Sequence, residues 1–401
     1  MKTKLVATLL FVLTAAIVAF YPAVKSGAAV TTHPIGVWPP ANPQSNARPK
    51  IDVVFVLDTT GSMSGLIDAA KEKIWSIASS MASAQPTPII RMGLVGYRDR
   101  GDEYVTRVVD LSGDIDTMYA TLMQFTANGG GDGPESVNQA LYEAVNSMSW
   151  SQDSDSYKAI FLVGDAPPHM DYQDDVKYPQ TLAVAAAKGI VVNTIQCGSE
   201  ADTRQRWQEI ASISHGSYFN VDQAGSAVAI ATPYDADLAR LSAALDDTRL
   251  YYGTKEEKAR QLAKVDATDA LHALASPASQ ARRAAFNASA AGVINAIGER
   301  ELVSDVASGR VDLAKVEADK LPEPLQSLSP NARKKLIDEN AAKRAELQQQ
   351  IKALADQRDE YAAGRIAAAG GAVDSLDAKI YGAVREQAKE KGMTYPDAPK
   401  Y

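Results

Sequence analysis

The chain has 401 residues, of which 46% are hydrophobic, so its size allows two or three domains with a sizeable core. Its net charge of −8 is uneven, because residues 1–50 carry 5 basic and no acidic side chains, residues 51–232 carry 11 basic and 23 acidic ones, and residues 233–401 are nearly balanced. The acidic middle segment suits cation binding and argues against nucleic acid as a partner. Cys197 is the single cysteine, which excludes an intramolecular disulfide and fits a buried small residue.

The N-terminal residues 1–29 are predicted to be a targeting segment. Two lysines precede the apolar stretch Leu5–Tyr21, and small residues at 26–29 permit cleavage there. The stretch is nearly long enough to span a membrane, so a retained N-terminal anchor is the alternative to a cleaved signal peptide. Both place the body outside the cytoplasm, in the periplasm or cell envelope, with secretion or inner-membrane anchoring as alternatives. Residues 30–50 contain 5 prolines and are expected to form an extended linker.

Residues 51–232 alternate between strand-like and helix-like segments. The expected strands are Ile51–Leu57, Ile89–Tyr97, Tyr104–Leu111, Ala159–Val163, Ile190–Gln196 and Ser217–Val221. The expected helices between them are Gly65–Ala82, Ile115–Phe125, Ser136–Met148, Asp174–Lys188 and Arg204–Ser212. This alternation predicts an α/β domain with a Rossmann-like, doubly wound, mostly parallel sheet that is covered by helices on both faces. Ligands of such sheets bind at the carboxyl ends of the strands.

Residues 235–401 are rich in alanine and charged side chains and are predicted to be all helical. The expected helices are Asp235–Tyr252, Lys255–Ala275, Gln280–Ile297, Glu299–Leu321 and a long one after Pro330. Ser276-Pro277 and Ser329-Pro330 have the pattern of helix starts. Leu347, Ile351, Leu354 and Tyr361 form a short heptad stripe that Arg344 and Arg358 interrupt, so we expect either a coiled coil or a helical hairpin over residues 330–391.

The first polar motif follows the strand Ile51–Leu57 directly. Asp58, Thr60 and Ser62 place one carboxylate and two hydroxyls where the chain turns into a helix. Three oxygen-bearing side chains at a strand end could form half of a shell around a hard divalent cation. The simpler alternative is a helix-capping turn, because all three residue types favour caps.

Two later loops could complete such a shell. The loop of residues 128–136, NGGGDGPES, brings Asp132, Glu135 and Ser136 to the start of a helix, and its glycines allow close approach of the backbone. Asp165 directly follows the strand Ala159–Val163. In a parallel sheet these loops would share one edge. The proposed metal ligands are therefore Asp58, Thr60, Ser62, Asp132 and Asp165.

With these motifs, residues 51–232 resemble the von Willebrand factor type A (VWA) domain, in an exported bacterial form. That family carries a metal-ion-dependent adhesion site, with the pattern D-x-[ST]-x-S, then a threonine loop, then an aspartate that ends a strand. DTTGS matches the first part at Asp58, Thr60 and Ser62, and AIFLVGDAPPH places the last aspartate at Asp165. The family's threonine is replaced by the GGGDGPE loop, which puts Asp132 at or near that position.

The ligand types favour a hard cation, with magnesium preferred and calcium or manganese as alternatives. The resemblance implies a protein partner that supplies an acidic side chain to the cation, and so an adhesion or scaffold protein. The oligomeric state is unknown, and any membrane contact would come through an uncleaved N-terminus. A cation-dependent hydrolase and a structural envelope protein with a purely stabilising metal are the alternatives.

The remaining candidates lie at the rim of the expected site. Glu135 and Ser136 could face the cation or cap the helix that follows them, and His169 is expected to be a nearby loop residue rather than a ligand. No catalytic residues are expected. Gly61–Gly65 has the glycine spacing of a nucleophile elbow, but Met63 occupies the position of the nucleophilic serine.

Overall fold

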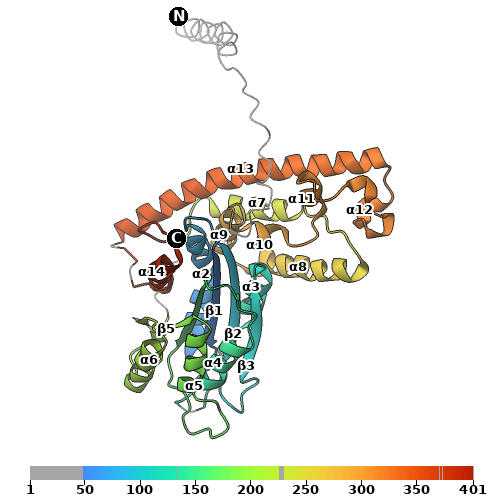
Figure 1. Ribbon diagram of the computed structural model, residues 1–401. Coiled ribbons are helices and arrows are strands. Elements are labelled where there is room, and N and C mark those ends of the chain that lie inside the picture. Colours follow the sequence, from blue (N-terminus) through green and yellow to red (C-terminus); the bar gives the residue numbers. More distant parts are fainter. Residues whose placement is uncertain (1–47, 132, 225–229, 370, 373, 401) are drawn as a thin grey trace, which may run out of the picture. The chain divides into compact units, whose positions relative to one another are not determined.

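The computed structural model describes residues 48–131, 133–224, 230–369, 371–372 and 374–400 (Figure 1). The predicted targeting segment 1–29, nearly all of the linker 30–50, and Asp132 lie outside the described residues. No helix in the described part of the chain is long and apolar enough to cross a membrane.

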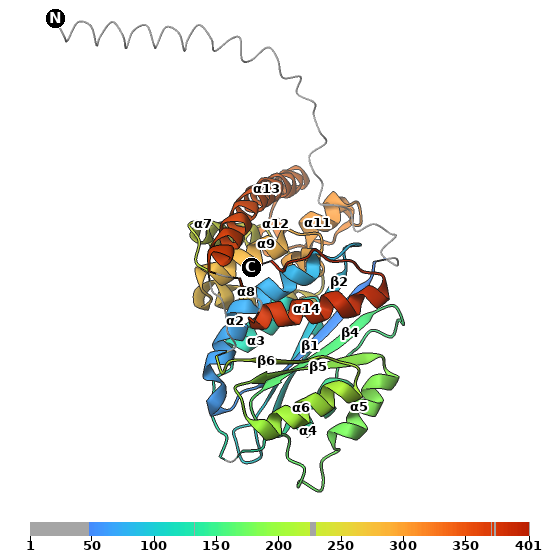
Figure 2. The same cartoon turned by 90° about the vertical axis from the view of Figure 1, so that its left-hand side faces the viewer.

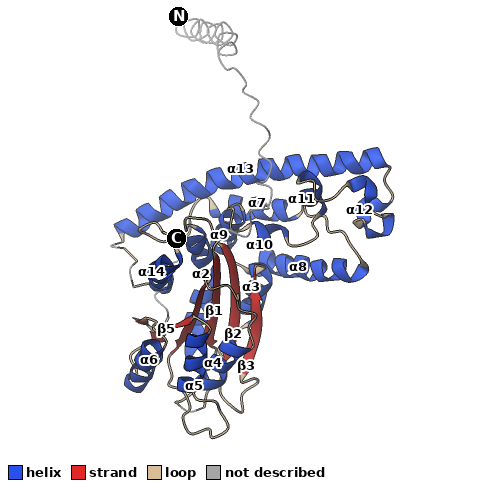
Figure 3. Ribbon diagram, in the orientation of Figure 1, coloured by secondary structure: helices blue, strands red, loops and turns tan. Residues whose placement is uncertain are grey.

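The first half of the described chain forms a six-stranded sheet, which confirms the predicted fold class (Figure 3). The strand order is β3-β2-β1-β4-β5-β6, and β3 alone runs antiparallel to its neighbour. The strands are β1 (Lys50–Asp58), β2 (Ile89–Tyr97), β3 (Thr106–Ser112), β4 (Tyr157–Gly164), β5 (Ile190–Cys197) and β6 (Tyr218–Val221). The helices between them are α2 (Ser64–Ala82), α3 (Ile115–Gln124), α4 (Val137–Asn146), α5 (Tyr178–Ala187) and α6 (Ala201–Ile213).

Alternating side chains of the central strand β1 build the two cores. Val53 and Phe55 pack in the core beneath α2 and α3, whereas Val54 and Val56 pack in the core beneath α4, α5 and α6. Strands in this position are buried on both faces, which explains why the sequence of β1 reads as a continuous apolar run. The helices therefore cover the sheet on both sides, as Figure 2 shows.

The second half of the described chain is helical, as expected. It contains α7 (Asp235–Asp246), α8 (Lys255–Leu274), α9 (Pro277–Asn287), α10 (Val293–Ile297), α11 (Leu302–Ala307), α12 (Glu323–Gln326), α13 (Pro330–Ala368) and α14 (Leu376–Ala388). The predicted helix starts are confirmed: Ser276 and Ser329 each accept a bond from the backbone amide three residues on, and a proline follows each serine. The single helix expected at Glu299–Leu321 is wrong, because Gly309 ends α11 in a left-handed conformation at φ 72°.

The expected hairpin over residues 330–391 is also wrong. α14 packs against α2 on the sheet, while α13 packs along α7, α9 and α11 (Figures 1 and 2). Leu376 and Ile380 of α14 are buried in the same core as the β1 side chains. Leu347, Ile351 and Leu354 of the heptad stripe pack against other helices of this chain, whereas Tyr361 is exposed. The two arginines that interrupt the stripe, Arg344 and Arg358, are buried in ion pairs.

Candidate functional site

The carboxyl ends of β1 and β4 lie side by side and bring the first and last predicted ligands together. The two strands pair in parallel from Ile51 opposite Tyr157 to Leu57 opposite Val163, so that Asp58 and Asp165 leave the sheet at the same edge. Asp58 is fully buried, Thr60 is 2% exposed, and Ser62 is exposed to solvent. The structure therefore brings Asp58, Thr60, Ser62 and Asp165 to one edge of the sheet, while Asp132 lies outside the described residues.

Hydrogen bonds hold the first motif as a polar turn. Asp58 Oδ1 accepts bonds from Thr60 N at 2.9 Å and from Thr60 Oγ1 at 2.6 Å, and Thr60 Oγ1 lies 3.4 Å from Ser62 Oγ. Neither Thr60, which precedes the 3-10 turn Gly61–Met63, nor Met63, which precedes α2, makes a side-chain capping bond. The helix-capping alternative for this motif is therefore not what holds it in place.

The glycine loop lies directly against this turn. Asn128 N donates to Thr59 O at 3.2 Å, and Gly61 N donates to Gly129 O at 3.2 Å. A side chain at Gly130 would be disfavoured by the backbone angle φ of 75° and crowded, because a Cβ there would lie 3.2 Å from both Glu135 Oε1 and Thr60 Cβ. The glycines thus allow the loop to bring Glu135 beside Thr60.

The structure gives the predicted rim residues different roles. Glu135 is 3% exposed, and its Oε2 is buried without a hydrogen-bond partner among the described residues. Ser136 does not cap α4; its hydroxyl donates to Asp99 Oδ1 at 2.9 Å. His169 Nδ1 lies 2.8 Å from Asp171 Oδ1, and the ring stacks on Tyr172, so His169 belongs to the neighbouring loop as expected.

Several residues of this edge were missed by the sequence analysis. Asp99 and Asp102 follow β2, and Asp102 Oδ2 accepts a bond from Gly130 N at 3.0 Å. Gln223, which follows β6, donates to Asp165 Oδ2 at 2.6 Å and to Ser62 O at 3.3 Å. Each of these residues follows the carboxyl end of a strand in this edge, a position that could have singled them out.

Crowded carboxyl groups dominate the electrostatics of the site. Burial raises the pKa of Asp58 to about 7, and the negative charge of Asp165 acts in the same direction. Burial raises the pKa of Glu135 to about 9, and nearby carboxylates add to the effect, Asp58 the most among them. Asp58 Oδ2 is buried and, among the described residues, has no hydrogen-bond partner of normal geometry. Buried carboxyl groups without a counter-charge favour protonation or a bound cation.

The donor set fits a hard cation. No group of three or more histidine, cysteine, aspartate or glutamate side chains in the described ranges is placed to hold a metal by itself, so the hydroxyls of Thr60 and Ser62 would have to contribute. A neighbouring cavity of about 560 Å³ opens beside Ser62 and Asp165, and its wall also includes Glu135, Glu200 and Asp202. The site is therefore acidic and accessible from solvent on this side.

Gly164 sets how closely β4 approaches this site. A Cβ at Gly164 would lie 2.5 Å from the hydroxyl oxygen of Tyr97 and 3.1 Å from Asp58 Oδ2. We expect Gly164→Ala to lower the free energy of unfolding by about 1–3 kcal/mol, measured by urea denaturation. Tyr97→Phe removes the obstructing hydroxyl and should recover part of the loss, whereas Gly382→Ala, whose Cβ would meet open space, should not destabilise the protein. Equal stability of the Gly164→Ala variant and the wild type would contradict this packing.

The fold and this edge together define a doubly wound α/β domain that gathers carboxylates and hydroxyls at the ends of its parallel strands. The sequence model of the von Willebrand factor A domain family matches residues 52–233, so this part of the chain is a VWA domain. VWA domains often mediate protein–protein interactions.

A curated relative and several solved structures are similar to this chain. The alpha-protein kinase vwkA of Dictyostelium discoideum is 27% identical over 121 residues, which cover 30% of this chain and 19% of the kinase. Proximal thread matrix protein 1 of the mussel byssus is 14% identical, with a TM-score of 0.35. The match covers 44% of this chain and 42% of the mussel protein. A second structure of that protein has a zinc-occupied MIDAS motif. The VWA domain of SpRpn10 is 13% identical with a TM-score of 0.34, over 44% of this chain and 89% of its own.

Proposed function

We propose that this protein binds another protein through a divalent cation held at the edge of the VWA sheet. Asp58, Thr60 and Ser62, with Asp165 from the neighbouring strand, are the residues that would hold the cation. The observation that carries the proposal is the buried Oδ2 of Asp58, which has no hydrogen-bond partner of normal geometry among the described residues and lies beside a second carboxylate, since a cation there would offset both negative charges. Magnesium is the preferred ion and calcium or manganese the alternatives, because every candidate ligand is a hard oxygen.

The same cation would supply a binding position for the partner. Two of the proposed ligands are neutral hydroxyls, so a bound divalent ion would keep enough positive charge to accept an acidic side chain from outside. Ser62 and Asp165 line the open cavity, which gives such a side chain a route to the ion. Asp132 of the glycine loop remains a proposed ligand, but it lies outside the described residues. The acidic residue of this loop that the structure describes is Glu135, which lies near Thr60.

Capture experiments test this proposal directly. The full chain, immobilised, is incubated with an extract of the native cell envelope in the presence of Mg²⁺, and is then washed with a chelator. We expect the chelator to release the partner, because the acidic side chain of the partner would be bound to the cation itself. The Asp58→Ala bait should capture nothing, whereas Asp68→Ala, which changes an exposed carboxylate on α2, should capture the partner normally.

Capture that survives the chelator and the Asp58→Ala change would contradict metal-dependent recognition. If Mg²⁺ still raised the melting temperature in that case, the metal would have a structural role alone. Export through the N-terminal segment is part of the proposal and rests on the sequence pattern of residues 1–29.

A further inference from the structure

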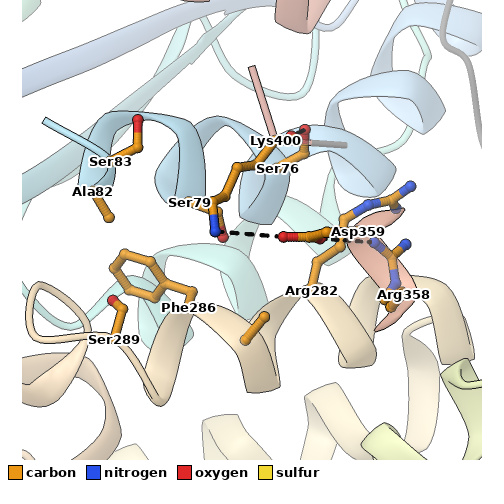
Figure 4. Close-up of a pocket in the computed structure, with 11 residues that line it drawn as sticks. Ser76, Ser79, Ala82, Ser83, Arg282, Phe286, Ser289, Arg358, Asp359 and Lys400 are labelled. Carbon is orange, nitrogen blue, oxygen red and sulfur yellow. Dashed lines mark hydrogen bonds and ion pairs between the residues drawn. The ribbon is translucent and has the colours of Figure 1, made fainter. Parts of the chain in front are cut away.

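A second polar cavity lies where α2 of the VWA domain meets the helical region. Its volume is about 80 Å³, and its wall combines serines from α2, Arg282 and Phe286 from α9, Arg358 and Asp359 from α13, and Lys400 near the end of the chain (Figure 4). α2 begins at the candidate cation site, and this cavity lies along its C-terminal half, so the two sites are separate. No part of the proposed protein-binding mechanism uses these residues.

Two hydrogen-bond donors in the cavity wall have no partner among the described residues. They are the Nε of Arg282 and the hydroxyl of Ser79, and both atoms are buried. Arg282 is only 3% exposed, and its Nη1 donates a long bond of 3.3 Å to the backbone oxygen of Glu72. Donors that are buried without acceptors are costly, and a buried guanidinium without a direct carboxylate partner is more so.

Among the described residues no carboxylate forms an ion pair with Arg282, although the charges of Glu72, Asp377 and Asp235 act on it from a greater distance. Arg358 Nε donates to Asp235 Oδ1 at 2.9 Å, and Lys400 Nζ lies 3.4 Å from Asp359 Oδ2. The ion pairs of the described residues thus engage Arg358 and Lys400 but not Arg282. Burial lowers the pKa of Arg282 to about 10, the positive charge of Arg358 acts in the same direction, and the carboxylates of Glu72, Asp377 and Asp235 oppose both effects. An anion in the cavity would relieve the repulsion between these two guanidinium groups.

We propose that this cavity binds a small oxyanion of the phosphate or sulfate type, held by the Arg282 guanidinium and the Ser79 hydroxyl. A guanidinium presents several N–H donors in one plane, which matches the spacing of oxygens on such an anion. A water molecule could accept one of these hydrogen bonds but would bring no negative charge between the Arg282 and Arg358 guanidinium groups. The bound anion would join α2 to α9 and α13, and would stabilise the attachment of the helical region to the VWA domain.

The test is calorimetric titration of the full chain with inorganic phosphate and, separately, with sulfate, at constant ionic strength set with chloride. We expect one site per chain, and the two titrations show which oxyanion it prefers. Arg282→Gln should weaken binding by about tenfold or more, because it removes a charge-assisted hydrogen bond. Ser79→Ala removes one neutral donor and should weaken binding less. Because this change is small, it still tests the site if the Arg282→Gln variant fails to fold.

The matched control is Arg365→Gln, which removes an exposed positive charge from α13 seven residues after Arg358. It should bind phosphate as the wild type does. The binding should also persist in the presence of a divalent-cation chelator, which separates this site from the proposed cation site. Absence of binding above the chloride background, or equal binding by the Arg282→Gln and Arg365→Gln variants, would overturn the proposal.

Discussion

Asp58→Asn is expected to abolish the rise in melting temperature that Mg²⁺ gives the wild type, and to make the metal-free protein more stable at pH 8. The amide keeps an oxygen for the bonds from Thr60 but carries no negative charge into the buried site. A purely structural aspartate would behave in the opposite way, since its loss would destabilise the protein with or without a cation.

The pH dependence follows from the raised pKa of Asp58. In the folded, metal-free protein this pKa is about 7, above the value of 3.8 for an ordinary aspartate. The Asp58 carboxyl therefore binds its proton more tightly in the folded state than in the unfolded chain. The stability that this proton contributes is complete below about pH 4 and is lost as the pH rises through 7. We expect the wild type in chelator to lose melting temperature across this range, and Mg²⁺ to reverse the loss.

The matched control for Asp58→Asn is Asp68→Asn, an exposed position on α2, the helix that follows the Asp58 turn. It should keep both the response to Mg²⁺ and the wild-type pH profile, measured by thermal unfolding at a series of pH values with Mg²⁺ or chelator. If Asp58→Asn destabilised the metal-free protein at pH 8, or kept its response to Mg²⁺, the assignment of Asp58 as the central ligand would be wrong.

Arg283→Met is expected to cost about 3–5 kcal/mol of unfolding free energy, because it removes the counter-charge that two buried carboxylates share. Arg283, on α9, is fully buried. Its Nε and Nη2 bond the two carboxylate oxygens of Asp116, on α3, at 2.6 and 2.7 Å. Its Nη1 bonds Asp246, at the end of α7, at 2.7 Å. These bonds connect the VWA domain to the helical region.

The charges of Arg283 and its neighbour Lys264 hold the pKa of Asp116 well below its usual range, despite the opposing effect of burial. The network should therefore remain ionised in moderately acidic solution, and the loss in Arg283→Met should be similar at pH 5 and pH 8 in urea denaturation. Arg240→Met is the control, because its ion pair with Asp237 is exposed and should contribute less than about 1 kcal/mol. A loss below that level for Arg283→Met would contradict the role of this network.

The sequence determined the fold of the VWA domain because its signals are local. Short apolar runs specify buried strands, and apolar residues at helical spacing specify amphipathic helices. The continuous apolar run of β1 is an example of the first pattern. The motif at Asp58, Thr60 and Ser62 and the aspartate at Asp165 could also be found, since parallel strands bring their carboxyl ends to one edge. That inference needs the order of the elements and no knowledge of side-chain packing.

Only the tertiary structure decided what surrounds that edge and where the helical region lies. Glu135 approaches Thr60 because Gly130 leaves space there, and Gln223 reaches Asp165 from a strand that is remote in sequence. The buried partners of Arg344 and Arg358 turned an apparent coiled-coil stripe into an internal packing surface. Contacts between residues far apart in sequence depend on how helices pack and which charges pair, and a local pattern such as the heptad stripe fits more than one such arrangement. The strand ends that gather the proposed cation ligands were therefore predictable from the sequence, whereas the attachment of α14 to the sheet and the Arg282 cavity were not.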